Sequence, residues 1–216
     1  MNPAAAPTPA LAGGGDALRR YYRLHARVYD WTRWSFLFGR GALVRGLAAG
    51  GAPERVWEIG CGTGANLRRL ARQFPRARLT GLDGSADMLA VARSSLHRRA
   101  RSVTFREGFY TAPLRPGPAP DVILFSYCLT MINPGWERVI GAAVADLAPG
   151  GRLAVVDFHG SEAAWFRRWM GVNHVRMERH LLPALKAALQ PELAEVRRAY
   201  GGWWEYFLFL GRKAAG

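Results

Sequence analysis

Three glycines at alternating positions in "VWEIGCGTGANL" (residues 56–67) carry the clearest chemical signal of the sequence. Gly60, Gly62 and Gly64 follow a predicted strand and open a predicted helix. Glycine lets a chain turn tightly and approach a ligand closely, and the N-terminus of the following helix favours an anionic group. The turn is therefore predicted to bind a nucleotide-like ligand.

A carboxylate stands at the end of the next predicted strand, where Asp83 closes "ARLTGLD". At the carboxyl edge of a parallel sheet it can accept both ribose hydroxyls of a nucleoside. Two ligand classes fit this pattern. Gly60, Gly62 and Ala65 formally match the dinucleotide fingerprint G-x-G-x-x-G/A. Glu58, two residues before the first glycine, would instead repel a pyrophosphate and suits an aminoacyl ammonium group.

Strands and helices alternate around these residues. The predicted strands cover 55–60, 77–83, 102–108, 121–128 and 152–158, and the predicted helices between them cover 64–74, 85–100 and 135–147. Such alternation indicates a parallel α/β sheet with helices on both faces.

The C-terminal part follows a different pattern. "AAWFRRWMGVNHVRMERHLLPALKAAL" predicts two helices around a loop. "LAEVRRAY" and "GWWEYFLFLGRK", joined by the glycines at 201–202, predict a hairpin. A late hairpin on a parallel sheet is expected to place an antiparallel edge strand at its end.

Length, charge and cysteine content narrow the class of protein. The 216 residues suffice for one sizeable domain, and no run approaches the roughly 18 apolar residues of a membrane span. The net charge of +14 predicts attraction to a polyanion, either nucleic acid or an anionic membrane. Cys61 and Cys128 lie far apart and form no metal-binding pattern, so no metal is predicted and a reducing cytoplasm is favoured.

The N-terminal fifty residues divide into two parts. Residues 1–15 are expected to be a flexible leader of Pro, Ala and Gly rather than a secretory signal. Residues 16–50 are predicted to form a helical lid ahead of the main domain at 51–216. Within the lid, "YYRLHARVYDWTRWSFLFGR" (21–40) interleaves aromatic rings with arginines. The stretch has three interpretations: a helix packed over the cofactor, a nucleic-acid binding element, or a helix at a membrane interface.

From about residue 55 to 160 the chain resembles class I S-adenosylmethionine-dependent methyltransferases. The pattern E-x-G-x-G-x-G and Asp83, 19 residues after Gly64, are followed in order by "EGFYTAPL", "PDVILFSYCLTMI" and "LAPGGRLAVVDF". The resemblance implies a Rossmann-like, mostly parallel seven-stranded sheet with an antiparallel C-terminal hairpin strand, and S-adenosyl-L-methionine as cofactor. It implies cofactor contacts from Glu58, Gly60, Cys61, Gly62, Gly64, Asp83, Gly84, Met88, Gly108, Phe109 and Ser126. Phe109 departs from the family pattern, because many members have an acid there that bonds the adenine amine.

The flanking segments resemble a narrower group. "YRLHARVYDWTRWSFLFGR" and "VDFHGSEAAWFRRWMGVNHVRMERHLLPAL" are similar to betaine-lipid N-methyltransferases of the BtaB type, relatives of bacterial phosphatidylethanolamine N-methyltransferases. The resemblance implies successive methylation of diacylglyceryl homoserine to diacylglyceryl trimethylhomoserine. It also implies a cytoplasmic enzyme on the anionic inner membrane surface and a pathway partner that makes the homoserine lipid, with no nucleic acid expected.

Other functions remain open at this point. The alternative function is that of a phosphatidylethanolamine N-methyltransferase. Nucleic-acid methyltransferases, small-molecule methyltransferases and a non-catalytic S-adenosylmethionine-binding module belong to other classes.

Transfer of a methyl group to an amine is an in-line displacement that requires alignment and a neutral nitrogen. The residues expected around the methyl group are Tyr29, His25 and Tyr127. The residues expected to bind substrate are Tyr22, Arg33, His159 and Arg176, of which the arginines can pair bidentately with a substrate carboxylate.

Overall fold

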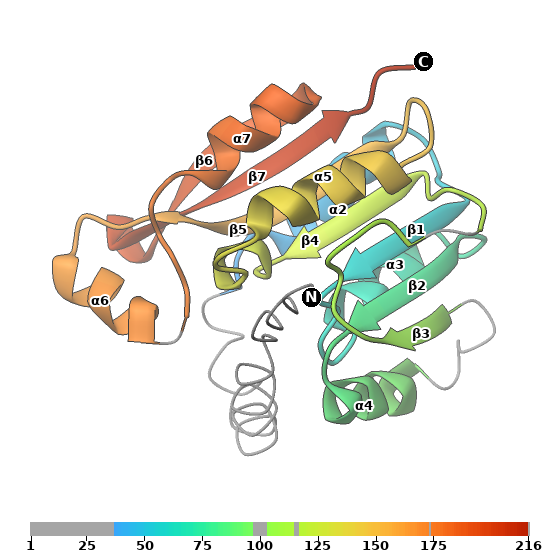
Figure 1. Ribbon diagram of the computed structural model, residues 1–216, viewed down its shortest axis with the longest axis horizontal. Coiled ribbons are helices and arrows are strands. Elements are labelled where there is room, and N and C mark those ends of the chain that lie inside the picture. The colour runs from blue at the N-terminus through green and yellow to red at the C-terminus, as the bar shows by residue number, and fades with distance from the viewer. Residues whose placement is uncertain (1–36, 97–102, 115–116, 173, 216) are drawn as a thin grey trace, which may run out of the picture.

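The computed structural model describes residues 37–96, 103–114, 117–172 and 174–215. Seven strands form one sheet in the order β3-β2-β1-β4-β5-β7-β6 (Figure 1). The strands are β1 (Arg55–Ile59), β2 (Arg78–Asp83), β3 (Val103–Glu107), β4 (Val122–Ser126), β5 (Arg152–Gly160), β6 (Gln190–Ala199) and β7 (Trp204–Arg212). The predicted mostly parallel seven-stranded sheet is confirmed.

The C-terminal hairpin lies at one end of the sheet, as predicted. β7 pairs antiparallel with both β5 and β6, so it lies inside the sheet, and β6 forms the edge. β7 is almost continuously buried, whereas β6 is mostly exposed or half-buried. A strand buried on both faces is stabilised by two neighbours, and a polar strand tolerates an edge. The predicted antiparallel edge strand is therefore β6, which pairs antiparallel with β7, and β7 itself lies one place inside the edge.

Helices cover both faces of the sheet. They are α2 (Arg40–Ala49), α3 (Ala65–Gln73), α4 (Ala86–Leu96), α5 (Trp136–Asp146), α6 (Ala164–Val172) and α7 (Leu181–Ala188), with short 3-10 turns η3 (Leu129–Met131) and η4 (Tyr200–Gly202). α5 and α7 lie over one face and α2 and α3 over the other (Figure 1). None of the described helices is long and apolar enough to cross a bilayer.

The core consists of two apolar layers separated by the sheet. β4 ("VILFS") is buried at every position, as expected for a central strand of a parallel sheet. On one face, Leu43, Val44 and Leu47 of α2 pack with α3 and the sheet. On the other, the apolar stripes of α5 and α7 pack against β5 and β7. The helices are thereby held at fixed positions along the strand ends.

The strand order reverses between β1 and β4. β2 and β3 extend the sheet on one side of β1, and β5 extends it on the other side of β4. In open α/β sheets a crevice for ligands forms outside the carboxyl ends of the strands at such a switch point. The glycine turn follows β1, and Tyr127 follows β4, so both predicted motifs lie at this point.

Candidate active site

The glycine turn is fixed to the end of β2. The amides of Gly60 and Cys61 donate to the carbonyl oxygen of Leu82 at 2.8 and 3.0 Å. Gly60, Gly62 and Gly64 all have positive φ, at 68°, 52° and 77°. A Cβ at Gly60 would lie 2.6 Å from the sulfur of Cys128, so glycine is needed there for close approach as well as for conformation. A Cβ at Gly62 would meet nothing within 4 Å, so this glycine faces open space.

Asp83 is oriented by the turn. Its Oδ2 accepts the amide of Gly62 at 2.8 Å, and its Oδ1 accepts the amide of Ser85 at 2.9 Å. Each carboxylate oxygen has a further lone pair. A half-buried carboxylate held in this way can still accept a vicinal diol such as a ribose.

Glu58 is a buried acid with an unsatisfied oxygen. Its residue is only 2% exposed, and its Oε1 accepts the amide nitrogen of Asn66 at 2.9 Å. Its Oε2 has no hydrogen-bond partner among the described residues. Burial raises the pKa of Glu58 to about 7, against the opposing effects of Asn66 and the Arg40 charge. A buried acceptor of this kind calls for a cationic donor, which is what the ammonium of an aminoacyl group supplies.

Arg40 is a site residue that sequence reasoning missed. It begins α2, and its Nε donates to Oγ of Ser126 at 2.9 Å. Its guanidinium carbon lies 5.9 Å from the centroid of the Tyr127 ring, and its charge lowers the pKa of Glu58. Arg40 therefore brings a cation to the carboxyl ends of β1 and β4. The sequence signal was weak, because Arg40 is one of several arginines in an arginine-rich stretch.

Tyr127, a predicted catalytic residue, is buried at 2% exposure. Its hydroxyl donates to the carbonyl oxygen of Phe38 at 2.9 Å, and its ring packs against Phe158 with centroids 4.7 Å apart. These contacts tie the segment before α2 to the end of β4. The arrangement favours a positioning role for Tyr127, through the chain that leads into the N-terminal region.

Asp157 holds the loop after β4 by hydrogen bonds, a role that the sequence did not reveal. Its fully buried carboxylate accepts the amides of Cys128 and Leu129 at 3.0 and 2.8 Å and the hydroxyl of Thr130 at 2.5 Å. Burial raises the pKa of Asp157, although these donors oppose the shift. Only the tertiary pairing of β4 with β5 brings this acid to the first turn of η3.

The predicted adenine segment lies beside Asp83. The amide of Gly108 donates to the carbonyl oxygen of Asp83 at 3.0 Å. Phe109 is 53% exposed, and its ring lies so close to Gly84 that a Cβ there would be 2.6 Å from it. Met88 is buried in α4. Phe109 thus offers an exposed ring at the position where the family pattern has an acid.

The predicted substrate residues are divided between the site and the surface. His159 is the last residue but one of β5, its Nδ1 is buried without a partner among the described residues, and burial lowers its pKa. The side chain of Arg176 is 58% exposed and lies 3.9 Å from Glu178. Only its amide joins the loop region, donating to the carbonyl oxygen of Thr130 at 3.0 Å. The remaining predicted residues, Tyr22, His25, Tyr29 and Arg33, lie outside the described residues.

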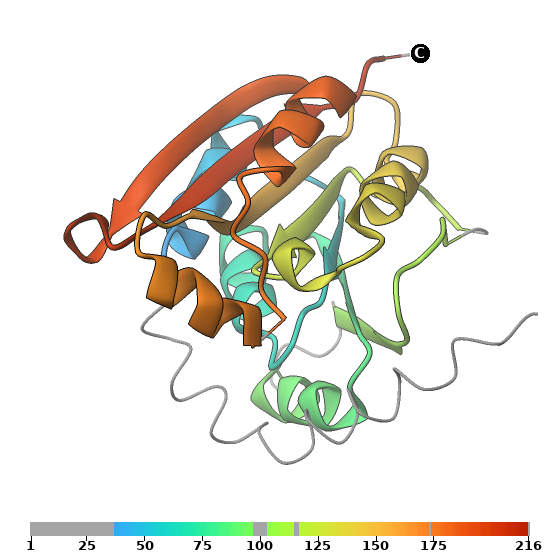
Figure 2. The same ribbon diagram turned by 60° about the vertical axis from the view of Figure 1, so that its left-hand side comes forward.

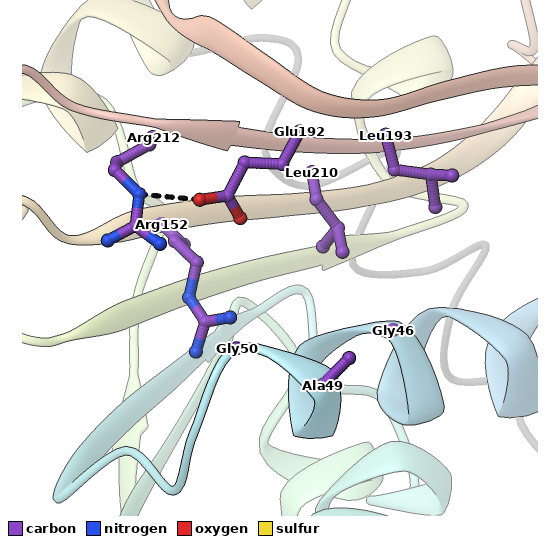
Figure 3. A pocket seen from close by; sticks show the side chains of 8 residues that line it. All are labelled: Gly46, Ala49, Gly50, Arg152, Glu192, Leu193, Leu210 and Arg212. Carbon is purple, nitrogen blue, oxygen red and sulfur yellow. Dashed lines mark hydrogen bonds and ion pairs between the residues drawn. The ribbon is translucent and has the colours of Figure 1, made fainter.

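A separate cavity of about 370 Å³ opens at the opposite edge of the sheet (Figure 3). Arg152 and Arg212, which pair where β5 begins and β7 ends, line it together with Glu192. No residue of the glycine turn lines this cavity. The guanidinium of Arg152 donates to the carbonyl oxygen of Leu47, near the end of α2. The cavity is therefore distinct from the site at the carboxyl ends of the strands.

Comparison with known proteins identifies the class. A family model described as "Methyltransferase domain" matches residues 56–151. The demethylmenaquinone methyltransferase of Tropheryma whipplei is 30% identical over 184 residues, which are 82% of this chain and 72% of that protein. The chain belongs to the methyltransferase family, as a class I S-adenosylmethionine-dependent member.

Other relatives match in part. The trans-aconitate 2-methyltransferase of Methylobacterium nodulans is 39% identical over 104 residues, and the match covers 48% of this chain but only 38% of that protein. Among solved structures, the 1,6-didemethyltoxoflavin-N1-methyltransferase of Burkholderia thailandensis superposes with a TM-score of 0.71 at 20% identity, covering 98% of this chain and 94% of that one. The N-methyltransferase NodS of Bradyrhizobium japonicum gives a TM-score of 0.65 at 23% identity, covering 81% and 94%. At these identities the structures show a shared fold.

Proposed function

We propose that this protein is an S-adenosylmethionine-dependent N-methyltransferase that acts on the headgroup amine of a membrane lipid, with diacylglyceryl homoserine as the first candidate acceptor. The observation that carries methyl transfer is the buried, half-satisfied carboxyl of Glu58 beside the glycine turn. When bound, S-adenosylmethionine supplies a methyl group on a sulfonium, which a neutral amine can attack.

The residues present fit this cofactor. The unsatisfied Oε2 of Glu58 would accept its ammonium, and Arg40 would pair with its carboxylate. Asp83, already oriented by the amides of Gly62 and Ser85, would accept the ribose hydroxyls. Phe109 would contact the adenine by stacking, since its ring is exposed next to Gly84.

Two histidines, His159 and His180, support an amine as the methyl acceptor. An amine must lose its proton before it attacks, so a neutral base near the strand ends is useful. Burial lowers the pKa of His159 and of His180, which favours the neutral form of each imidazole. The ring of His180 is tilted against that of Trp136, with centroids 4.9 Å apart. We propose that Trp136 contributes cation–π attraction for a methylated ammonium.

The lipid acceptor rests on the resemblance of the flanking segments to betaine-lipid N-methyltransferases and on the charge of +14. A second candidate is carbon methylation of a demethylmenaquinone-like ring. The Tropheryma whipplei relative favours it, because that match extends over 82% of the chain and 72% of that protein. The trans-aconitate match carries less weight for the acceptor, since it covers only 48% of the chain.

The purified full chain should be incubated with S-adenosylmethionine and each acceptor in detergent micelles: diacylglyceryl homoserine, phosphatidylethanolamine, demethylmenaquinone and, without micelles, trans-aconitate. Mass spectrometry would count the methyl groups added. Addition of up to three methyl groups to the homoserine lipid supports the proposal. Methylation of the quinone ring alone would replace it with the second candidate.

A further inference from the structure

The outward face of α6 is unusually apolar for a surface helix. Only Phe166 and Met170 of this helix are buried. Trp165 and Trp169 are 63% and 50% exposed, and Val172 is 77% exposed. Together with Arg168 they follow the spacing i, i+3, i+4 and i+7, so they share one face of the helix.

The tip of the β6–β7 hairpin extends this face. Trp203 is 65% exposed, and its ring lies 6.3 Å from that of Trp165 in an edge-to-face arrangement. Tyr200, 49% exposed, adds a further ring beside Phe38 at 5.4 Å. Figure 2 shows α6 and the hairpin tip at the same end of the molecule. We call the surface formed by Trp165, Arg168, Trp169, Val172 and Trp203 the tryptophan patch.

Arginines lie within and beside the tryptophan patch. The side chain of Arg198, near the end of β6, is 80% exposed, and Arg168 on α6 is exposed as well. Arg167, the neighbour of Arg168, donates to the carbonyl oxygen of Ser161 and so fixes the start of α6. Exposed tryptophans prefer the boundary between water and lipid, and arginines are attracted by anionic headgroups.

The tryptophan patch is close to the strand ends that carry the site. β5 ends at Gly160, and α6 begins four residues later, at Ala164. The hydroxyl of Ser161 donates to the carbonyl oxygen of Trp203 at 2.5 Å, which joins the hairpin tip to the end of β5. A surface resting on the patch would therefore face the carboxyl ends of the strands.

We propose that the tryptophan patch docks the protein on a bilayer that contains anionic phospholipid, with the rings in the headgroup region and the arginines against lipid phosphates. This inference deepens the proposed lipid methylation and rests on it for its biological meaning, but the docking is measurable without methyl transfer. A second copy of the chain is a poorer occupant, because it would bring the same arginines and a net charge of +14 to the contact.

The test measures flotation of the full chain with vesicles of phosphatidylcholine, with and without phosphatidylglycerol, in the absence of S-adenosylmethionine and of any amine acceptor. We expect binding to the anionic vesicles and a loss of about tenfold or more in the Trp165→Ala/Trp203→Ala double variant and in Arg168→Glu, because rings and charge each contribute to interfacial binding. Arg69→Glu is the matched control: Arg69 is exposed on α3 and changes the net charge equally. Affinity for S-adenosylmethionine and the thermal transition report the fold of each variant, and Arg168→Glu leaves the packed rings in place.

Several results would overturn the docking proposal. They are an absence of binding by the wild-type chain, full binding by both patch variants, or an equal loss in Arg69→Glu. A concentration-dependent dimer in analytical ultracentrifugation, lost in the patch variants without any vesicle binding, would assign the surface to a second copy. Vesicle binding through the patch by an enzyme that methylates no lipid would uphold the docking and refute the proposed acceptor.

Discussion

Glu58 combines deep burial with an ionisable carboxyl beside the turn that holds the cofactor. Its pKa of about 7 means that the free protein carries this group partly protonated at neutral pH. An ammonium at Oε2 would favour the ionised form. Binding of S-adenosylmethionine below pH 7 must then release a proton from Glu58.

The affinity for S-adenosylmethionine is therefore expected to fall by up to about tenfold per pH unit below pH 7. It should fall again above about pH 8, where an α-amino group loses its proton. In Glu58→Gln the acidic limb should disappear and the affinity at pH 7.5 should drop. Isothermal titration calorimetry across this pH range measures both effects, with Glu54→Gln, exposed ahead of β1, as the control. An unchanged acidic limb in Glu58→Gln would exclude Glu58 as the ammonium ligand.

The same carboxyl should cost stability in the absence of cofactor. Because burial raises its pKa from 4.5 to about 7, the folded state binds a proton more tightly than the unfolded state. Its contribution to stability is present below pH 4.5 and is lost as the pH rises to about 7. Glu58→Gln should thus raise the free energy of unfolding at pH 8 by up to about 3 kcal/mol, at about 1.4 kcal/mol per pKa unit. Urea denaturation at pH 5 and pH 8 checks this, and a variant less stable than wild type at pH 8 would contradict it.

Arg40 is expected to bind the carboxylate of the methyl donor. Arg40→Met should raise KM for S-adenosylmethionine by about 10–100-fold, the range for a charge-assisted hydrogen bond. It should change kcat little, because the carboxylate is bound equally in ground and transition states. Steady-state kinetics with Arg45→Met, exposed on the same helix, provides the comparison. A fall in kcat at constant KM would place Arg40 nearer the acceptor.

At the level of elements, the loop after β4 is shaped by an acid from β5. Asp157 accepts three amides and one hydroxyl from the segment Cys128–Thr130, which lies next to the strand that ends at Ser126. This contact determines how the chain leaves β4 at the carboxyl edge. The acid therefore links the packing of the sheet to the shape of the site.

Asp157→Asn should destabilise the fold by about 2–4 kcal/mol, because the amide cannot accept from all the buried donors and brings donors of its own. Thr130→Val, which removes only the hydroxyl partner, should cost about 1–2 kcal/mol. Thermal or urea unfolding measures both. Equal losses in the two variants would show that the backbone amides gain little from Asp157.

At the scale of the whole molecule, the described sheet forms a packed unit. The described sheet, together with α2, has its own core, in which Leu43, Val44 and Leu47 are buried. Two of the three residues predicted to surround the methyl group, His25 and Tyr29, precede α2 in the chain. Cofactor binding and acceptor methylation are thus expected to depend on different parts of the molecule.

A chain that starts at residue 36 should keep a cooperative thermal transition, within about 2–4 °C of the full chain, which corresponds to a loss of about 1 kcal/mol in a domain of this size. Its transfer of methyl groups to the proposed lipid acceptor should fall by about 100-fold or more, because we expect the proton transfer and alignment that His25 and Tyr29 provide to be lost. Calorimetry and the micellar assay measure the two quantities. Full activity of the shortened chain would show that His25 and Tyr29 have no role in the reaction.

The sequence by itself determined the cofactor half of the protein. The periods of apolar residues and the glycine spacing are local properties, so strand, turn and helix could be located from Val56 to Phe158 before any contact was known. Glu58 and Asp83 could be predicted as cofactor ligands because each lies near the end of a predicted strand. Even the hairpin of β6 and β7 was predictable, because its turn glycines and flanking strands are adjacent in the chain.

The tertiary structure alone decided the contacts between distant segments. β7 enters the sheet between β5 and β6 because burial on both faces favours two neighbours, a choice that depends on the whole sheet. Arg40 meets Ser126, Tyr127 meets Phe38 and Asp157 meets Thr130 across long sequence separations. Hydrogen bonds of this kind leave no periodic trace in the sequence, and only packing of the helices on the sheet brings their partners together.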